Sequence, residues 1–152
     1  MKRNLKVAGI GAILFLILAG AANAQTPRKG IVDEPKGQVE IRTAGGQWQA
    51  AQQGSILNEG DEIRAAEQSS AIILLDDAGA TGKLELREKS RLRMTTMGLD
   101  AVSGDQQTLL ELATGKVLIH AEKLKGESRF EVKTPNAITG VRGTVFEVSV
   151  ED

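Results

Sequence analysis

The chain has 152 residues, a formal net charge of −1, a single histidine and no cysteine. This composition excludes disulfide support and a zinc site of ordinary composition, which needs several cysteine or histidine ligands. Because the residues after position 24 carry 16 basic and 20 acidic side chains, nucleic acid and anionic membrane surfaces are disfavoured as partners. We expect no metal and no cofactor.

The first 24 residues have the pattern of a secretory signal peptide. Lys2, Arg3 and Lys6 precede an uncharged, mostly apolar stretch, which ends at the small-x-small sequence Ala22-Asn23-Ala24. The apolar stretch is short for a membrane helix, which needs about 20 such residues. We therefore predict cleavage after Ala24 and no membrane span in the mature form. The expected location is the periplasm, with secretion as the alternative, and cleavage changes the formal charge to −4.

Residues 25–36 are polar, contain two prolines and predict a flexible lead-in. From residue 37 onward, short runs of alternating polar and apolar residues are separated by glycine-containing turns, which is typical of β-strands. The strongest local prediction is a hairpin made by residues 70–75 and 83–87. A second predicted hairpin joins residues 107–112 to 116–121 around Ala113-Thr114-Gly115.

No convincing helical pattern occurs outside the leader. We predict an all-β fold of short antiparallel or mixed strands, arranged as a sandwich, a roll or a short solenoid, in one small domain over residues 37–152.

Catalytic patterns are sparse. No serine lies in a G-x-S-x-G context, and one tryptophan without any tyrosine offers little to line a sugar-cleaving groove. His120 is expected to be a strand-end side chain paired with a neighbour. Trp48 is expected to be core or half-buried, with stacking on a sugar ring as the alternative. We predict that the protein is not an enzyme.

The acidic turn around Gly60-Asp61 lacks the ligand spacing of a calcium loop, so we interpret it as a structural turn. The last apolar segment is more distinctive. It reads TPNAITGVRGTVFEV over residues 134–148, with Thr134-Pro135 indicating a strand end and turn. Gly140 and Gly143 then bracket Val141-Arg142, where glycines permit a bulge or close backbone approach. Arg142 is interpreted either as a structural charge or as a recognition residue.

This segment resembles the signature of the FecR-type periplasmic domain family, which has Thr-Pro followed by Val-Arg-Gly-Thr and an alternating strand. Trp48, Gly54, Gly60 and Asp61 also match that family in order. The resemblance covers residues 37–150. It implies a domain that, in members of full architecture, relays a signal from an outer-membrane transporter to a sigma factor.

Two functions follow as expectations. The resemblance implies a non-enzymatic sensing or interaction module without the anti-sigma region, whose partner is an envelope protein bound at Val141, Arg142, Gly143 and Thr144. In that reading Thr134, Pro135, Gly140, Gly60 and Asp61 form the structural motif. The alternative is a structural or glycan- and peptidoglycan-binding envelope domain, with Trp48 as its anchor.

The final strand ends at Glu151-Asp152, whereas the family usually continues with another strand. The expectation is either a short, acid-capped edge or a truncated domain that lacks its last strand. An exposed edge here would offer backbone groups to a partner strand, so we predict that partner binding uses it.

Overall fold

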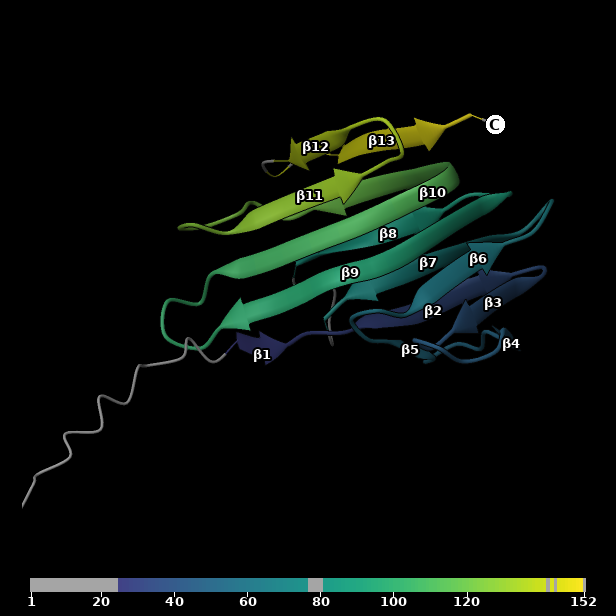
Figure 1. Ribbon diagram of the computed structural model, residues 1–152, viewed down its shortest axis with the longest axis horizontal. Coiled ribbons are helices and arrows are strands. Elements are labelled where there is room, and N and C mark those ends of the chain that lie inside the picture. The colour runs from purple at the N-terminus through teal and green to yellow at the C-terminus, as the bar shows by residue number, and fades with distance from the viewer. Residues whose placement is uncertain (1–24, 77–80, 142, 144, 152) are drawn as a thin grey trace, which may run out of the picture.

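A computed structural model describes residues 25–76, 81–141, 143 and 145–151, and the predicted signal peptide lies outside them. The described chain is all-β, without a helix (Figure 1). Its strands are β1 (Gln25–Pro27), β2 (Gly30–Lys36), β3 (Val39–Arg42), β4 (Gln49–Ala50), β5 (Ile56–Leu57), β6 (Glu62–Ala65), β7 (Ser70–Leu75), β8 (Gly82–Leu86), β9 (Ser90–Asp100), β10 (Gln106–Ala121), β11 (Arg129–Lys133), β12 (Ile138–Val141) and β13 (Val145–Val150).

All these strands belong to one curled sheet with the path β4-β3-β6-β9-β10-β8-β7-β2-β5. We call the part formed by β1, β3, β4, β6, β9, β11, β12 and the first half of β10 half A. Half B contains β2, β5, β7, β8, β13 and the second half of β10. Every pairing is antiparallel except that of β10 with β11, which is parallel. The predicted all-β fold of mixed strands is therefore confirmed, in the form of a roll.

Strand β10 bends back on itself and joins the two halves (Figure 1). Strand β11 begins beside Gln107, although the connection from Ala121 spans only residues 122–128. A straight β10 would place its two ends roughly 50 Å apart, farther than a connection of that length can reach, about 30 Å. The bend is at Gly115, where φ is 85° and an added Cβ would lie 2.5 Å from the Lys89 carbonyl oxygen.

The hairpin predicted around Ala113-Thr114-Gly115 is therefore wrong, because residues 107–121 form one bent strand rather than two paired ones. The hydroxyl of Ser90 explains why the strand continues. It accepts a bond from the backbone N–H of Lys116 at 2.7 Å and donates to the carbonyl of Lys116 at 3.1 Å. The bend is thereby held against β9 instead of turning through a tight loop.

The core lies between the two halves, which both point alternate side chains inward. Its fully buried large members are Phe130, Leu57, Ile63, Ile73, Leu75, Leu84, Leu86, Leu92, Met94, Met97, Leu110 and Leu112. The predicted hairpin of residues 70–75 and 83–87 is confirmed by the pairing of β7 with β8.

The expected flexible lead-in over residues 25–36 is wrong, since this segment forms β1 and β2. Strand β1 pairs with β9, and β2 lies between β5 and β7. Pro35 is tolerated because it lies in a strand that is interrupted by a register shift between Val32 and Glu34. Burial of Val32 in the core ties the segment to the domain.

Candidate functional site

The signature segment begins with a turn that closes the hairpin of β11 and β12. The backbone N–H of Thr134 donates to the carbonyl of Ala137 at 2.8 Å, and the N–H of Ala137 donates to Thr134 Oγ1 at 3.1 Å. Pro135 lies inside this exposed turn. Thr134 therefore closes the turn with both its backbone N–H and its side-chain hydroxyl. Threonine commonly makes such local hydrogen bonds in turns.

The segment then crosses from half A to half B. Strand β12 pairs with β11 and ends at Val141, whereas β13 begins at Val145 and pairs with β10. Arg142 and Thr144 lie outside the described residues, so the structure leaves their predicted roles untested. Val141 is 8% exposed and lies opposite Phe130 in the β11–β12 ladder. It faces the core rather than a partner.

Gly143 has a backbone conformation that only glycine adopts easily. Its φ is 57°, and an added Cβ would lie 2.8 Å from the Cα of Lys123. Gly140, by contrast, has no atom within 4 Å of its added Cβ. The need for glycine in this segment is therefore strong at Gly143 and weak at Gly140.

Both halves end at this side of the molecule with an edge strand. Among the described strands, β12 pairs only with β11 and β13 pairs only with β10. Ile138 of β12 is 64% exposed and Val145 of β13 is 61% exposed. Exposed edges of this kind can accept a further strand. We call the surface formed by β12, Gly143 and β13 the open side.

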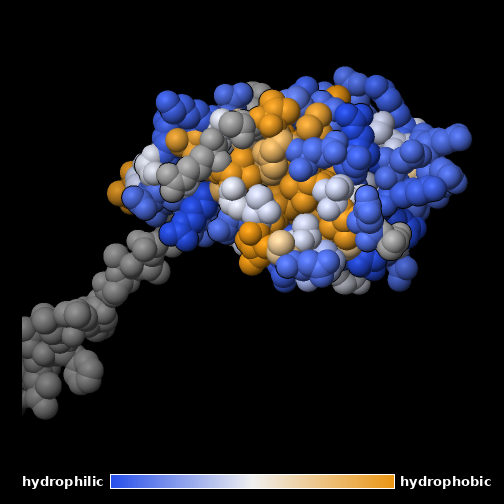
Figure 2. Space-filling view, turned by 90° about the horizontal axis from the view of Figure 1, so that it is seen from above, coloured by the Kyte–Doolittle hydropathy of each residue, from blue (hydrophilic) through white to orange (hydrophobic). Residues whose placement is uncertain are grey.

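Apolar side chains gather on the open side. Phe146, Val148 and Val150 point inward from β13 and are only partly buried against the core. Figure 2 looks onto this side and shows hydrophobic residues in its middle with hydrophilic ones around them. An apolar surface with a polar rim is the usual anatomy of a protein interface.

A loop of mixed charge borders the open side where the chain crosses between the halves, with Glu122 and Glu127 beside its two lysines. Lys123 and Lys125 lie in the connection from β10 to β11, and Arg129 opens β11. A cleft of about 470 Å³ is lined by Lys123, Leu124, Gly126, Glu127, Ser128 and Arg129. A neighbouring cleft of about 470 Å³ reaches Gly140 and Val141 through Ser128 and Arg129. Basic and acidic side chains thus lie together at one end of the signature segment.

The structure places Gly60 and Asp61 away from the open side, in a turn against β9. Gly60 donates its N–H to the carbonyl of Met94 at 2.6 Å with a φ of 91°. Asp61 is buried and accepts the backbone N–H groups of Asn58 and Ala44 at 2.8 and 3.1 Å. Both residues stabilise this turn. Gly60-Asp61 and the segment of residues 134–148 are therefore two separate structural features.

Trp48 is half-buried, as one of its two expectations stated, and it lies outside the core cluster. Its ring packs on the guanidinium groups of Arg42 and Arg64, at 4.7 and 4.2 Å from their Cζ atoms. These arginines are fixed in turn by Glu62 at 2.9 Å and Glu40 at 2.7 Å. Cation–π stacking on two arginines that are themselves ion-paired therefore explains how Trp48 packs on the outer face of half A.

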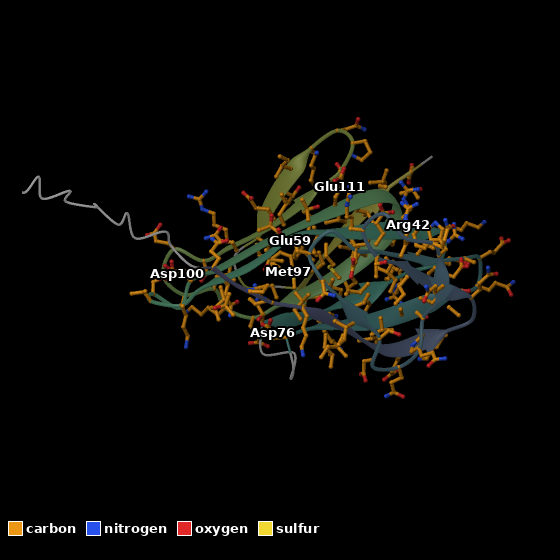
Figure 3. The ribbon with its side chains drawn as sticks, turned by 60° about the horizontal axis from the view of Figure 1, so that its bottom comes forward. Arg42, Glu59, Asp76, Met97, Asp100 and Glu111 are labelled. Carbon is orange, nitrogen blue, oxygen red and sulfur yellow. The ribbon has the colours of Figure 1, made fainter. Side chains whose placement is uncertain are left out.

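Sequence reasoning missed the most buried ion pair that we find among the described residues. Arg28, which is 7% exposed, donates Nε to Asp76 Oδ1 at 2.9 Å and Nη1 to Thr108 Oγ1 at 2.9 Å. Thr81 also donates its hydroxyl to Asp76. The group lies beside the end of β7 (Figure 3) and ties together three segments distant in sequence. No signal in the sequence pointed to it, because Arg28 lies beside Lys29 within the segment predicted to be a flexible lead-in.

His120 fits its expected structural role. Its Nε2 lies 3.0 Å from Glu85 Oε1 on the neighbouring strand β8. Across the described ranges, no three side chains of histidine, aspartate or glutamate gather as a metal site would require. The same residues include no helix of the length and apolarity needed to cross a membrane.

The fold and the open side define an all-β domain that presents two sheet edges joined by a glycine-dependent crossing. The model of the FecR protein family matches residues 61–152, more than half of the chain. The chain therefore belongs to the FecR family. No curated protein and no solved structure matches the chain.

Proposed function

We propose that this protein is exported to the periplasm and acts there as a non-enzymatic sensing and interaction module. One observation carries the proposal: the described strands of both halves of the sheet end in edge strands, β12 and β13, on the same side. Membership of the FecR family supports a regulatory role for the domain.

The proposed partner is a protein of the cell envelope that binds the open side. Ile138 and Val145 offer exposed apolar contacts there, and the free edges offer backbone hydrogen bonds. Lys123 and Arg129, together with Glu127, supply a rim of mixed charge, which suits charged groups of both signs on the partner. The signature segment is central to this surface because it connects the two edges.

The test is a crosslinking pull-down from envelopes of cells that produce the full chain. We expect one envelope protein to be recovered, and its recovery to fall at least tenfold with Ile138→Lys or Val145→Lys. Val102→Lys is the matched control, because Val102 is 98% exposed at the tip of the β9–β10 hairpin, away from the open side. Arg142→Ala tests the recognition role predicted for that arginine.

Recovery of the same protein at the same level with all three lysine variants would contradict binding at the open side. Recovery of cell-wall material alone, unaffected by the variants, would contradict the module itself. That second result would favour the envelope-binding alternative, in which a glycan panel should quench the fluorescence of Trp48.

A further inference from the structure

The free edge of β13 has a defined set of outward peptide groups. The carbonyl of Lys116 accepts the N–H of Arg87, so the peptide groups of Lys116 point toward β8 and β9. Peptide groups alternate along a strand, so those of Val117 and Ile119 point toward β13. Their register partners Val148 and Phe146 therefore face β10. The peptide groups of Val145, Glu147 and Ser149 face the free edge.

A second copy of β13 could add to this edge in an antiparallel arrangement around a twofold axis. Two registers keep nearly the whole strand paired while matching its outward groups. One centres the axis on Glu147 and places this carboxylate opposite its own copy, which is destabilising. The other centres it on Val148 and places Glu147 opposite Ser149 of the second copy. Charge therefore selects the Val148 register.

The inner face of the strand is also self-complementary in the Val148 register. Val148 lies opposite its own copy, and Phe146 lies opposite Val150 of the second copy. Within one chain, Val148 already continues a row formed by Ala71, Leu86 and Val117. The twofold axis would extend this apolar row through both molecules. It would cover the partly buried side chains of the open side.

The ends of the strand bring an acidic residue toward a lysine. In the Val148 register, Val145 lies opposite Glu151 of the second copy. A Cβ added to Gly143, just before Val145, would lie 2.8 Å from the Cα of Lys123, so Glu151 of one copy approaches Lys123 of the other. The two ends are equivalent by symmetry, and each copy therefore gains the same complementary contact.

We infer that the protein forms a symmetric dimer by antiparallel pairing of β13 with β13 of a second copy, centred on Val148. This inference goes beyond the proposed function, because it needs no envelope partner. The dimer and the envelope partner therefore compete for the β13 edge, whereas β12 and its exposed Ile138 stay available on both copies of the dimer.

The first test is the molar mass of the purified protein by light scattering, for which we expect twice the mass of one chain. The second uses the absence of native cysteine. In the Val148 register, the two Val148 residues form a non-hydrogen-bonded pair with Cα atoms about 4.5 Å apart. That separation lies within disulfide range. We expect Val148→Cys to yield a disulfide-linked dimer under oxidising conditions.

Ser149→Cys is the matched control. Each copy lies one residue from the axis on opposite sides, so the two are offset by two residues, about 7 Å along the strand, too far for a disulfide. Ser149→Pro tests the edge itself. Proline removes the backbone N–H of residue 149, which faces outward, so the pairing of β13 with β10 is kept. We expect that variant to elute as a folded monomer.

A wild-type protein that stays monomeric at high concentration, with Val148→Cys remaining reduced, would overturn the dimer. A dimer in which Ser149→Cys crosslinks and Val148→Cys does not would overturn the pairing. Neither outcome bears on the envelope partner, since both measurements use purified protein.

Discussion

Arg28 and Asp76 form a two-point ion pair across the fold, with Nε to Oδ1 at 2.9 Å and Nη2 to Oδ2 at 3.2 Å. The Arg28 side chain is only 5% exposed. Loss of either partner would leave a buried charge uncompensated, which typically costs about 3–5 kcal/mol.

Arg28→Met should therefore lower the free energy of unfolding by about 3 kcal/mol, toward the lower limit because Asp76 keeps some contact with water. Urea denaturation measures this change. Lys36→Ala is the control, because the pair of Lys36 with Glu34 is exposed and should contribute at most about 1 kcal/mol. Equal losses in the two variants would show that the Arg28 pair has no special role.

The two signature glycines should respond differently to alanine. Gly143→Ala introduces a Cβ 2.8 Å from the Cα of Lys123 at a φ of 57°. A cost of about 1–3 kcal/mol in unfolding free energy is expected from the backbone strain. Gly140→Ala meets nothing within 4 Å, and its effect should stay within about 0.5 kcal/mol. Thermal unfolding of both variants tests this, and a greater loss at Gly140 would refute it.

The environment of Trp48 can be followed directly, since it is the only tryptophan. Arg64→Ala should shift its emission to longer wavelength and lower the stability by about 1 kcal/mol, because the ring loses one stacked cation. Arg93→Ala is the control, on the same outer face but without contact to the ring. An unchanged spectrum for Arg64→Ala would show that the stacking does not persist in solution.

Asp100 gives the fold an acid dependence at the β9–β10 hairpin tip (Figure 3). The backbone N–H groups of Ser103 and Val102 donate to its carboxylate and hold the pKa of Asp100 below its ordinary value of 3.8. A lowered pKa in the folded state contributes stability above the unfolded-state value. That contribution disappears as the pH falls through the folded-state value.

Asp100→Asn should therefore be less stable than wild type at neutral pH. The difference in unfolding free energy should shrink in acid, because Asp100 of the wild type is then protonated and uncharged like the asparagine. Urea midpoints across an acidic pH series, together with the NMR titration of the Asp100 carboxyl, measure this effect. A difference that is constant with pH would indicate a cause other than the charge of Asp100.

Local patterns were sufficient for much of the fold. Alternation around Leu84 and Leu86 predicted the return strand of the β7–β8 hairpin, and the Thr134-Pro135 pair marked the turn before β12. These features depend on neighbours in sequence. The bend at Gly115 could not be predicted, because Ala113-Thr114-Gly115 fits a hairpin turn equally well, and only the distant hydroxyl of Ser90 decides between them.

The same reason explains the wrong prediction for the N-terminal segment. Polar residues and two prolines indicated a lead-in, whereas Val32 and Arg28 are buried by partners distant in sequence, namely β5 and β7 for Val32 and Asp76 for Arg28. Trp48 had two open expectations because its environment depends on arginines from two different strands. For the candidate site, the sequence located the segment and suggested an exposed edge at the final strand, but it did not indicate that β12 forms a second edge on the same side.

The bent strand β10 also determines when the chain can fold as it is made. The two halves of the sheet are joined only when residues 106–121 are available. Strands β8, β9, β11 and β13 all hydrogen-bond to β10, so neither half is complete without it. Pairings between distant segments form slowly. We therefore expect a nascent or translocating chain to remain unfolded until most of its length has emerged. Such a delay would suit the proposed export, and it also makes the chain dependent on protection from aggregation until it folds.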